Sequence, residues 1–308
     1  MWNTRYLAAN KLAAPKEWKD LTRPEYFGHV AISSPSRSGT TQLTVETILQ
    51  GEGWDKGWGQ LLEMMGNAAA VTERSFGVPD GVNNGQYGIG IVIDFFGLAS
   101  KFSGLPVDFV YPSMTAVVPA NIALLAGGKN PDEAKKFMAY SMSSEGQQLL
   151  FDPKISRLPI LPYSQLKAPA GYPDPQEVAK RAKVQFDSTL SEARYQVVTS
   201  LFDQMVTFRL KELQAATKAI HEADKALKAK PNARGGELLR QARSLAYTPL
   251  VGAENVKNEQ FLELFRKSRR DVEVSKQLSG QEQLWADKAR DNYARAAQLA
   301  GEARGLAK

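Results

Sequence analysis

Hydroxyl-bearing side chains gather in one short segment of the sequence, Ser33–Thr41, which reads SSPSRSGTT. The segment lies between an apolar run that predicts a strand and a stretch whose apolar spacing predicts a helix. Free backbone N–H groups and the helix dipole would favour a phosphate, a carboxylate or another anion there, and glycine lets the backbone approach a ligand closely. The sequence therefore predicts an anion-binding site, whose candidate residues are Ser36, Arg37, Ser38, Gly39, Thr40 and Thr41.

A simpler interpretation of this segment stays open. Ser38 could merely cap the helix N-terminus, with a plain loop before it. The Gly-x-x-x-x-Gly-Lys spacing of a nucleotide-binding loop is absent, so the segment is not of that type. Arg37 could hold an anion through two parallel hydrogen bonds, or it could be a solvated loop arginine.

Three further residues could reach the same ligand. Asp94 follows the apolar run Ile89–Ile93, where a carboxylate is out of pattern. It could accept hydrogen bonds from sugar-like or glycerate hydroxyls, or it could cap the turn that follows. Arg74 and Ser75 could supply a positive charge and a hydroxyl, or they could belong to a surface loop. These three residues complete the predicted ligand-binding set.

The composition argues against several other kinds of site. The 308 residues contain no cysteine, which excludes disulfides, zinc–thiolate sites and a cysteine nucleophile. The two histidines, His29 and His221, lie far apart in the sequence, which disfavours a histidine-based metal site or catalytic triad. No nucleophile–base set, metal cluster or cofactor loop stands out, so we expect a protein that is not an enzyme and that uses no cofactor or metal.

The positive charge is concentrated in the C-terminal part. Residues 1–165 hold 14 Lys+Arg against 15 Asp+Glu, whereas residues 166–308 hold 25 against 18. Because the basic residues alternate with acidic ones, as on solvated helix faces, we expect no nucleic-acid partner. No apolar stretch reaches the roughly 18 residues of a membrane span, and the first residues do not resemble a signal peptide.

The elements that must position the candidate residues form two sections. The first section alternates strand-like and helix-like segments, which indicates an α/β fold. Strands are expected at 28–33, 87–93 and 107–111, and helices at 41–50, 55–66 and from a capping Asn130 onward.

The composition changes near residue 169, where Pro169–Pro175 predicts a linker or domain boundary. Beyond it, apolar residues at helical spacing run from Val178 to Phe208, and Gln281–Ala307 is alanine-rich and amphipathic. We expect an all-α C-terminal extension, whose helices bury apolar stripes against one another or against the α/β part.

Several motifs resemble the type 2 periplasmic solute-binding proteins of ABC importers (extracellular solute-binding family 1), in the branches for ferric iron, phosphonates and sugar phosphates. The motifs are Trp18–Leu21 with Pro24–Gly28, Ser38–Thr41, Asn84–Gly90 and Ser143–Gln147. Arg157-Leu158-Pro159 and the long helical extension are similar to the branch that handles phosphoglycerate. The resemblance covers roughly residues 1–165.

This resemblance implies a clamp of two parallel-sheet lobes with the ligand in the cleft between them. Most of the first lobe would then be missing from the chain. The implied divisions are a crossing strand and linker (1–19), the second, ligand-gripping lobe (20–98), a return to the first lobe (99–168) and the helical C-terminal extension (169–308).

The resemblance also implies a function, namely periplasmic solute binding for an ABC-type uptake or ligand-sensing system. The ligand would be phosphoglycerate or a related organophosphate, and the partner an ABC permease or a membrane sensor kinase. Iron-binding members carry two tyrosines where this chain has Asp94-Phe95-Phe96, and phenylalanine has no oxygen to bind iron. The alternatives are a ferric-iron-type binding protein and a helical signalling or interaction module.

Overall fold

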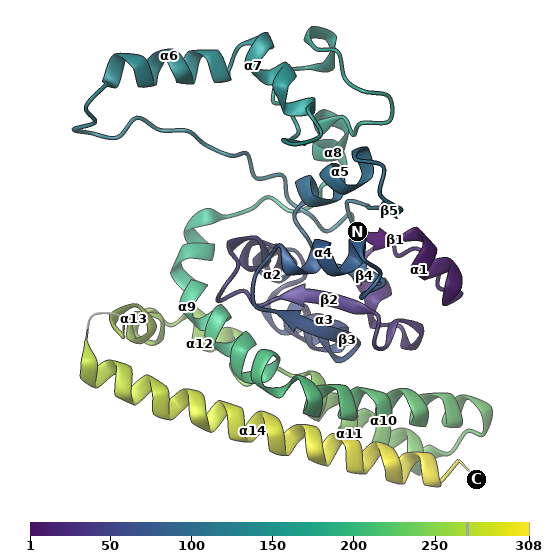
Figure 1. The fold of residues 1–308 in the computed structure, drawn as a ribbon. Helices are drawn as coiled ribbons and strands as arrows, with labels where there is room; N and C mark the ends of the chain where they lie inside the picture. Colours follow the sequence, from purple (N-terminus) through teal and green to yellow (C-terminus); the bar gives the residue numbers. More distant parts are fainter. Residues whose placement is uncertain (269–270, 308) are drawn as a thin grey trace.

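A five-stranded sheet with the strand order β3–β2–β4–β1–β5 forms the centre of the computed structural model, which describes residues 1–268 and 271–307 (Figure 1). Strand β2 (Val30–Ser33) pairs in parallel with β3 (Ala68–Thr72) and with β4 (Ile89–Gly90). Strand β1 (Trp2–Asn3) pairs antiparallel with β4 and with β5 (Val107–Asp108). The sheet is therefore parallel on the side that carries the predicted ligand loop.

Helices α2 (Gly39–Glu52) and α3 (Trp54–Gly66) follow β2 and connect it to β3. The four residues of β2 are all buried, which explains their continuous apolar run. Gly53 separates the two helices with a φ of +84°, a conformation that glycine adopts without the steric penalty of a Cβ atom. Helix α3 buries Trp58, Leu61 and Leu62 in the core.

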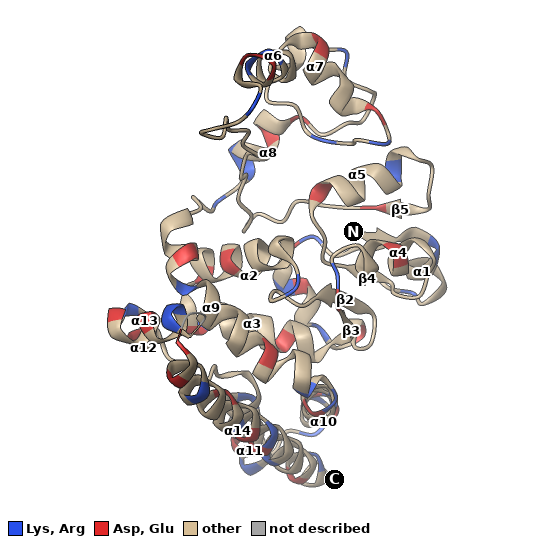
Figure 2. Cartoon of the chain, turned by 60° about the vertical axis from the view of Figure 1, so that its left-hand side comes forward, with Lys and Arg blue, Asp and Glu red and all other residues tan. Residues whose placement is uncertain are grey.

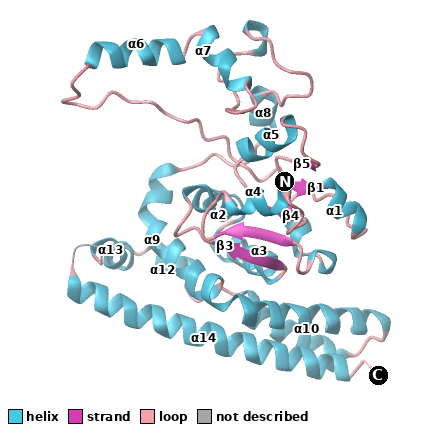
Figure 3. Cartoon of the chain, viewed as in Figure 1, coloured by secondary structure: helices cyan, strands magenta, loops and turns pink. Residues whose placement is uncertain are grey.

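The second half of the chain is helical (Figure 3). Its elements are α8 (Pro175–Arg181), α9 (Ser188–Met205), α10 (Leu210–Ala229), α11 (Ala233–Tyr247), α12 (Ala253–Lys257), α13 (Glu259–Lys267) and α14 (Val272–Gly305). Helices α10, α11 and α14 pack side by side below the sheet in Figure 1. Lys and Arg alternate with Asp and Glu along them, as the sequence suggested (Figure 2).

These helices share one hydrophobic core with the α/β part. Polar contacts cross the same boundary. Arg194 of α9 forms a buried ion pair with Glu46 of α2, and Trp54 of α3 donates its indole N–H to the Val251 carbonyl at 2.7 Å. The helical region is thus packed against the sheet-bearing part through both apolar and polar contacts.

Residues between β5 and α8 extend away from this core (Figure 1). They include α6 (Pro131–Ser141) and α7 (Ser144–Gln148). No residue of α6 is buried, and Phe137 of this helix is 62% exposed. We call residues 109–168 the arm. The remaining α-helices are α1 (Thr4–Ala9), α4 (Gly77–Asn83) and α5 (Asp94–Phe102).

The predicted α/β part followed by a helical region is confirmed. The strands at 28–33, 87–93 and 107–111 are present but shorter, and β3 and α4 were not predicted. The helix expected to continue from Val178 to Phe208 is interrupted between α8 and α9. Among the described residues, no helix is both long and apolar enough to cross a membrane.

Candidate functional site

The three groups of predicted ligand-binding residues follow three neighbouring parallel strands. Ser36–Thr41 follows β2, Arg74 and Ser75 follow β3, and Asp94 lies shortly after β4. Because β2, β3 and β4 are parallel, their carboxyl ends meet at one edge of the sheet, where ligands of α/β proteins commonly bind. The fold thus brings all three groups to the same edge.

The loops after β2 and β3 are in direct contact. The backbone N–H of Ser34 donates to the Thr72 carbonyl at 3.0 Å, and Arg37 Nη1 lies 3.2 Å from Glu73 Oε1. In this ion pair the side chains of Arg37 and Glu73 are 56% and 74% exposed, so the pair contributes little to stability. An incoming anion could therefore replace the Glu73 carboxylate at low cost.

Ser38 and Thr41 shape the start of helix α2. Ser38 Oγ accepts hydrogen bonds from the Thr41 backbone N–H at 3.2 Å and from Thr41 Oγ1 at 3.1 Å. Both residues are buried. Their hydroxyls therefore hold the loop against the helix, which is the capping role that the sequence left open.

Gly39 and Thr40 form the accessible part of the same helix end. Gly39 is exposed, and a Cβ atom added to it would meet no other atom within 4 Å. Thr40 is half-buried. A ligand can therefore approach the first backbone N–H groups of α2, which is a 14-residue helix with a full dipole.

Asp94 is the first residue of α5 and forms a small polar group of its own. One carboxylate oxygen accepts from the Phe95 backbone N–H at 2.8 Å, and the other accepts from the Tyr111 hydroxyl at 3.1 Å. Burial and then the charge of Asp94 raise the pKa of Tyr111 well above its usual range. Among the described residues, no hydrogen bond or ion pair joins Asp94 to the loops after β2 and β3.

Arg157 belongs to the same group, although it was not predicted as a site residue. Its guanidinium carbon lies 3.2 Å from the centre of the Phe95 ring. Burial lowers the pKa of Arg157, and the nearby Asp94 carboxylate partly opposes that shift. The side chain is therefore a partly desolvated positive charge beside the predicted acidic residue. Its only sequence signal was the Arg-Leu-Pro motif, which carried no role for it.

A second residue missed by the sequence comes from helix α9. The hydroxyl of Ser34 donates to Asp203 Oδ1 at 2.9 Å, and the hydroxyls of Ser34 and Ser36 lie 2.8 Å apart. Asp203 is 169 residues from Ser34 in the sequence, so no local pattern could have found it. Among the described residues, no group of three or more His, Cys, Asp or Glu side chains is arranged to hold a metal ion.

Comparison with known proteins places residues 1–179 in the family described as bacterial extracellular solute-binding protein. The phosphoglycerate transport regulatory protein PgtC of Salmonella typhimurium is 37% identical over 227 residues, which cover 73% of this chain and 56% of that protein. A probable ABC transporter periplasmic-binding protein of Sinorhizobium fredii is 27% identical over 169 residues, covering 51% and 45%. The chain thus spans about half the length of these curated relatives.

Two solved structures share the fold. The periplasmic binding protein P5PA superposes with a TM-score of 0.53 at 22% identity, over 67% of this chain and 65% of that one. The periplasmic binding protein AfuA from Actinobacillus pleuropneumoniae, with fructose-6-phosphate bound, gives a TM-score of 0.53 at 23% identity, over 66% and 64%. These matches support a periplasmic-binding-protein architecture.

Proposed function

Because the chain belongs to the bacterial extracellular solute-binding protein family, we propose that it binds a small organophosphate in the periplasm for an ABC-type uptake or sensing system. The observation that carries this proposal is the open N-terminus of α2 at the carboxyl edge of the sheet, beside two exposed arginines. The name of the Salmonella relative and the ligand of the AfuA structure both favour a phosphorylated compound. Phosphoglycerate is the ligand we propose first.

The phosphate group would bind the backbone N–H groups of Gly39 and Thr40, where the helix dipole adds a favourable positive potential. Arg37 would leave Glu73 and pair with the phosphate, and Arg74 would supply a second charge. Arginine suits this role because its planar guanidinium can donate two parallel hydrogen bonds to phosphate. Ser75 would offer its hydroxyl from the loop after β3.

The glycerate end of the ligand would extend toward Asp94. Its hydroxyl can donate to that carboxylate, and its carboxylate can pair with Arg157. A polar group of opposite charges at this position suits a ligand that carries a hydroxyl and a second anion. The binding step needs no bond to be made or broken, so we propose a binding protein and not an enzyme.

Calorimetric titration of the chain with 3-phosphoglycerate tests this proposal. Arg37→Gln and Arg74→Gln should each weaken binding by about tenfold, because each removes one charge-assisted contact to phosphate. Arg181→Gln is the matched control, since Arg181 is an exposed arginine on α8, outside the three loops. Binding that is absent, or equal in all three variants, would contradict an anion site at this edge.

We further propose that the arm belongs to the opposing lobe and moves toward the 20–98 lobe when ligand binds. The support is that the arm leaves the central core and exposes apolar side chains, among them Phe137. The partner that receives or reports the ligand would be an ABC permease or a membrane sensor kinase.

The absence of cysteine makes this closure measurable. Cysteines introduced at Lys56 of α3 and Lys136 of α6, both highly exposed, can carry a donor and an acceptor dye. Energy transfer should rise on addition of saturating 3-phosphoglycerate. Unchanged transfer with calorimetrically proven binding would contradict closure while leaving the anion site intact.

A further inference from the structure

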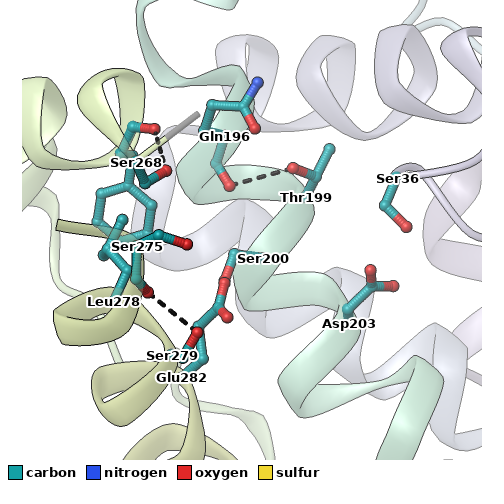
Figure 4. A pocket seen from close by; sticks show the side chains of 11 residues that line it. Ser36, Gln196, Thr199, Ser200, Asp203, Ser268, Ser275, Leu278, Ser279 and Glu282 are labelled. Atoms are coloured by element: carbon teal, nitrogen blue, oxygen red, sulfur yellow. Dashed lines mark hydrogen bonds between the residues drawn. The ribbon is translucent and has the colours of Figure 1, made fainter. Parts of the chain in front are cut away.

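A polar pocket of about 220 Å³ lies between the loop after β2 and the helices α9, α13 and α14 (Figure 4). Ser36 lines it from the loop side, Thr199, Ser200 and Asp203 line it from α9, and Ser279 and Glu282 line it from α14. Apart from Ser36, these residues follow residue 179, where the family match ends. The pocket is therefore built mostly by the helical region.

Several hydroxyl groups of this pocket have already given their hydrogens to the protein. The Ser275 hydroxyl and the Gln196 side-chain amide also line it, and among the described residues they donate no hydrogen bond. Thr199 donates to the Tyr195 carbonyl at 3.0 Å, and Ser279 donates to the Ser275 carbonyl at 3.0 Å. Ser200 donates to Glu282 Oε1 at 2.5 Å. A hydroxyl has one hydrogen, so each of these oxygens can offer a ligand only its lone pairs.

The same reasoning applies to Ser36. Ser34 donates its only hydroxyl hydrogen to Asp203, so the hydrogen between the Ser34 and Ser36 oxygens must come from Ser36. Ser36 Oγ therefore also presents lone pairs. Four hydroxyl oxygens from three segments of the chain act as acceptors on the walls of one pocket.

Two carboxylates add negative charge to these acceptors. Asp203 Oδ1 accepts from Ser34 and from Thr207 Oγ1 at 2.7 Å, and Glu282 Oε1 accepts from Ser200. Within residues 1–268 and 271–307, Asp203 Oδ2 and Glu282 Oε2 accept no hydrogen bond. In Figure 4 both carboxylates lie beside α9, on either side of the Ser200 turn.

We propose that this pocket binds a small organic ammonium ion, such as a short aliphatic amine or diamine. An ammonium group carries three donors and no acceptor, which is the complement of walls that offer acceptors and negative charge. A phosphate would be repelled by the two carboxylates, so this pocket is distinct from the proposed organophosphate site. A neutral polyol carries no positive charge to pair with the two carboxylates.

Titration of the full chain with 1,4-diaminobutane at low ionic strength tests the proposal. We expect saturable binding in a one-to-one ratio, with glycerol giving none. Glu282→Gln should weaken the affinity by about tenfold or more, because it removes the charge of one acceptor without changing its size. Asp203→Asn should have a similar effect, and Thr199→Val should produce a smaller one. Asp291→Asn is the matched control, since Asp291 lies on α14 with a 69% exposed side chain and does not line the pocket.

Three results would overturn the proposal. These are no binding to the unmodified chain, glycerol binding of similar strength, or equal weakening by Glu282→Gln and Asp291→Asn. Should Asp203→Asn fail to fold because Ser34 and Thr207 lose their partner, Glu282→Gln decides the matter. The test does not depend on organophosphate binding, so a failed phosphoglycerate titration would leave its result unaffected.

Discussion

Lowering the pH from 7 to 5 should destabilise the protein through His221. This residue lies on α10 and is 9% exposed, with its Nε2 atom 2.8 Å from Asn67 Oδ1. The Asn67 amide nitrogen donates to the Leu21 and Arg23 carbonyls, at 2.8 and 2.9 Å, which fixes Oδ1 as the atom facing the imidazole. Nε2 must therefore carry the hydrogen, and within the described part of the chain the buried Nδ1 has no hydrogen-bond partner.

Protonation of His221 would place an unpaired N–H and a positive charge in the core. Burial, assisted by the charge of Arg243, lowers the pKa of His221 from 6.5 to about 4. A lowered histidine pKa means that the neutral form is favoured by folding. The stabilisation that neutral His221 contributes is therefore complete above pH 6.5 and is lost as the pH falls toward 4. Below pH 4 it does not change further.

The size of the effect follows from the two pKa values. With 6.5 in the unfolded chain and about 4 in the folded one, the loss of unfolding free energy is about 2 kcal/mol at pH 5 and about 3 kcal/mol in the acid limit. Urea denaturation of the chain and of His221→Gln, each at pH 7 and pH 5, measures this loss. Carboxylates contribute alike to both proteins, so the difference between the two pH dependences isolates His221.

We expect His221→Gln to be less stable than the parent at pH 7, and to lose about 2 kcal/mol less than the parent does between pH 7 and pH 5. Equal losses in the two proteins would refute the assignment of a neutral, Nε2-protonated imidazole.

Two further predictions concern the packing between the α/β part and the helices. Glu46→Gln should cost about 3–5 kcal/mol of unfolding free energy because it leaves Arg194 charged and buried, whereas Glu46→Leu combined with Arg194→Met should recover most of that loss in urea titrations. A double variant whose loss of unfolding free energy equals the sum of the losses from the two single substitutions would contradict this. Gly66→Ala should cost about 1–3 kcal/mol, since its Cβ would fall 1.9 Å from Thr217 Oγ1. Gly280→Ala, with nothing within 4 Å, should instead stabilise α14 by about 0.5–1 kcal/mol, and equal melting temperatures for the two variants would refute the packing argument.

Local chemistry explains what the sequence could predict. The strand, serine cap and helix around Ser38 depend on neighbouring residues, and the structure contains all three. Strand β3 was missed because Ala68-Ala69-Ala70 has no strand preference of its own and becomes a strand through its pairing with β2. The strands at 87–93 and 107–111 were expected to be longer because apolar composition does not show where pairing stops.

Long-range contacts explain what the sequence could not predict. Arg157, which lies in the arm, stacks on the ring of Phe95 in α5. Asp203 accepts a hydrogen bond from Ser34, which is 169 residues away in the sequence. Each is an ordinary polar residue in its own segment, and only the tertiary fold gives it a position at the edge of the sheet. The motif resemblance correctly indicated the family, but beyond residue 165 it rested only on the length and helicity of the extension and could not place individual side chains.

Helix α9 contacts both helix α2 and the loop that precedes it. The first turn of α2 carries the proposed phosphate-binding N–H groups, and two turns later Glu46 is held by Arg194 of α9. Arg194 of α9 thus holds the helix whose N-terminus is the proposed anion site, while Asp203, near the C-terminal end of α9, holds the loop through Ser34. Displacement of α9 would therefore move both the helix dipole and the loop that precedes it. If the proposed anion site binds ligand, we therefore expect a change in the packing of the helical region to alter ligand affinity without touching the ligand.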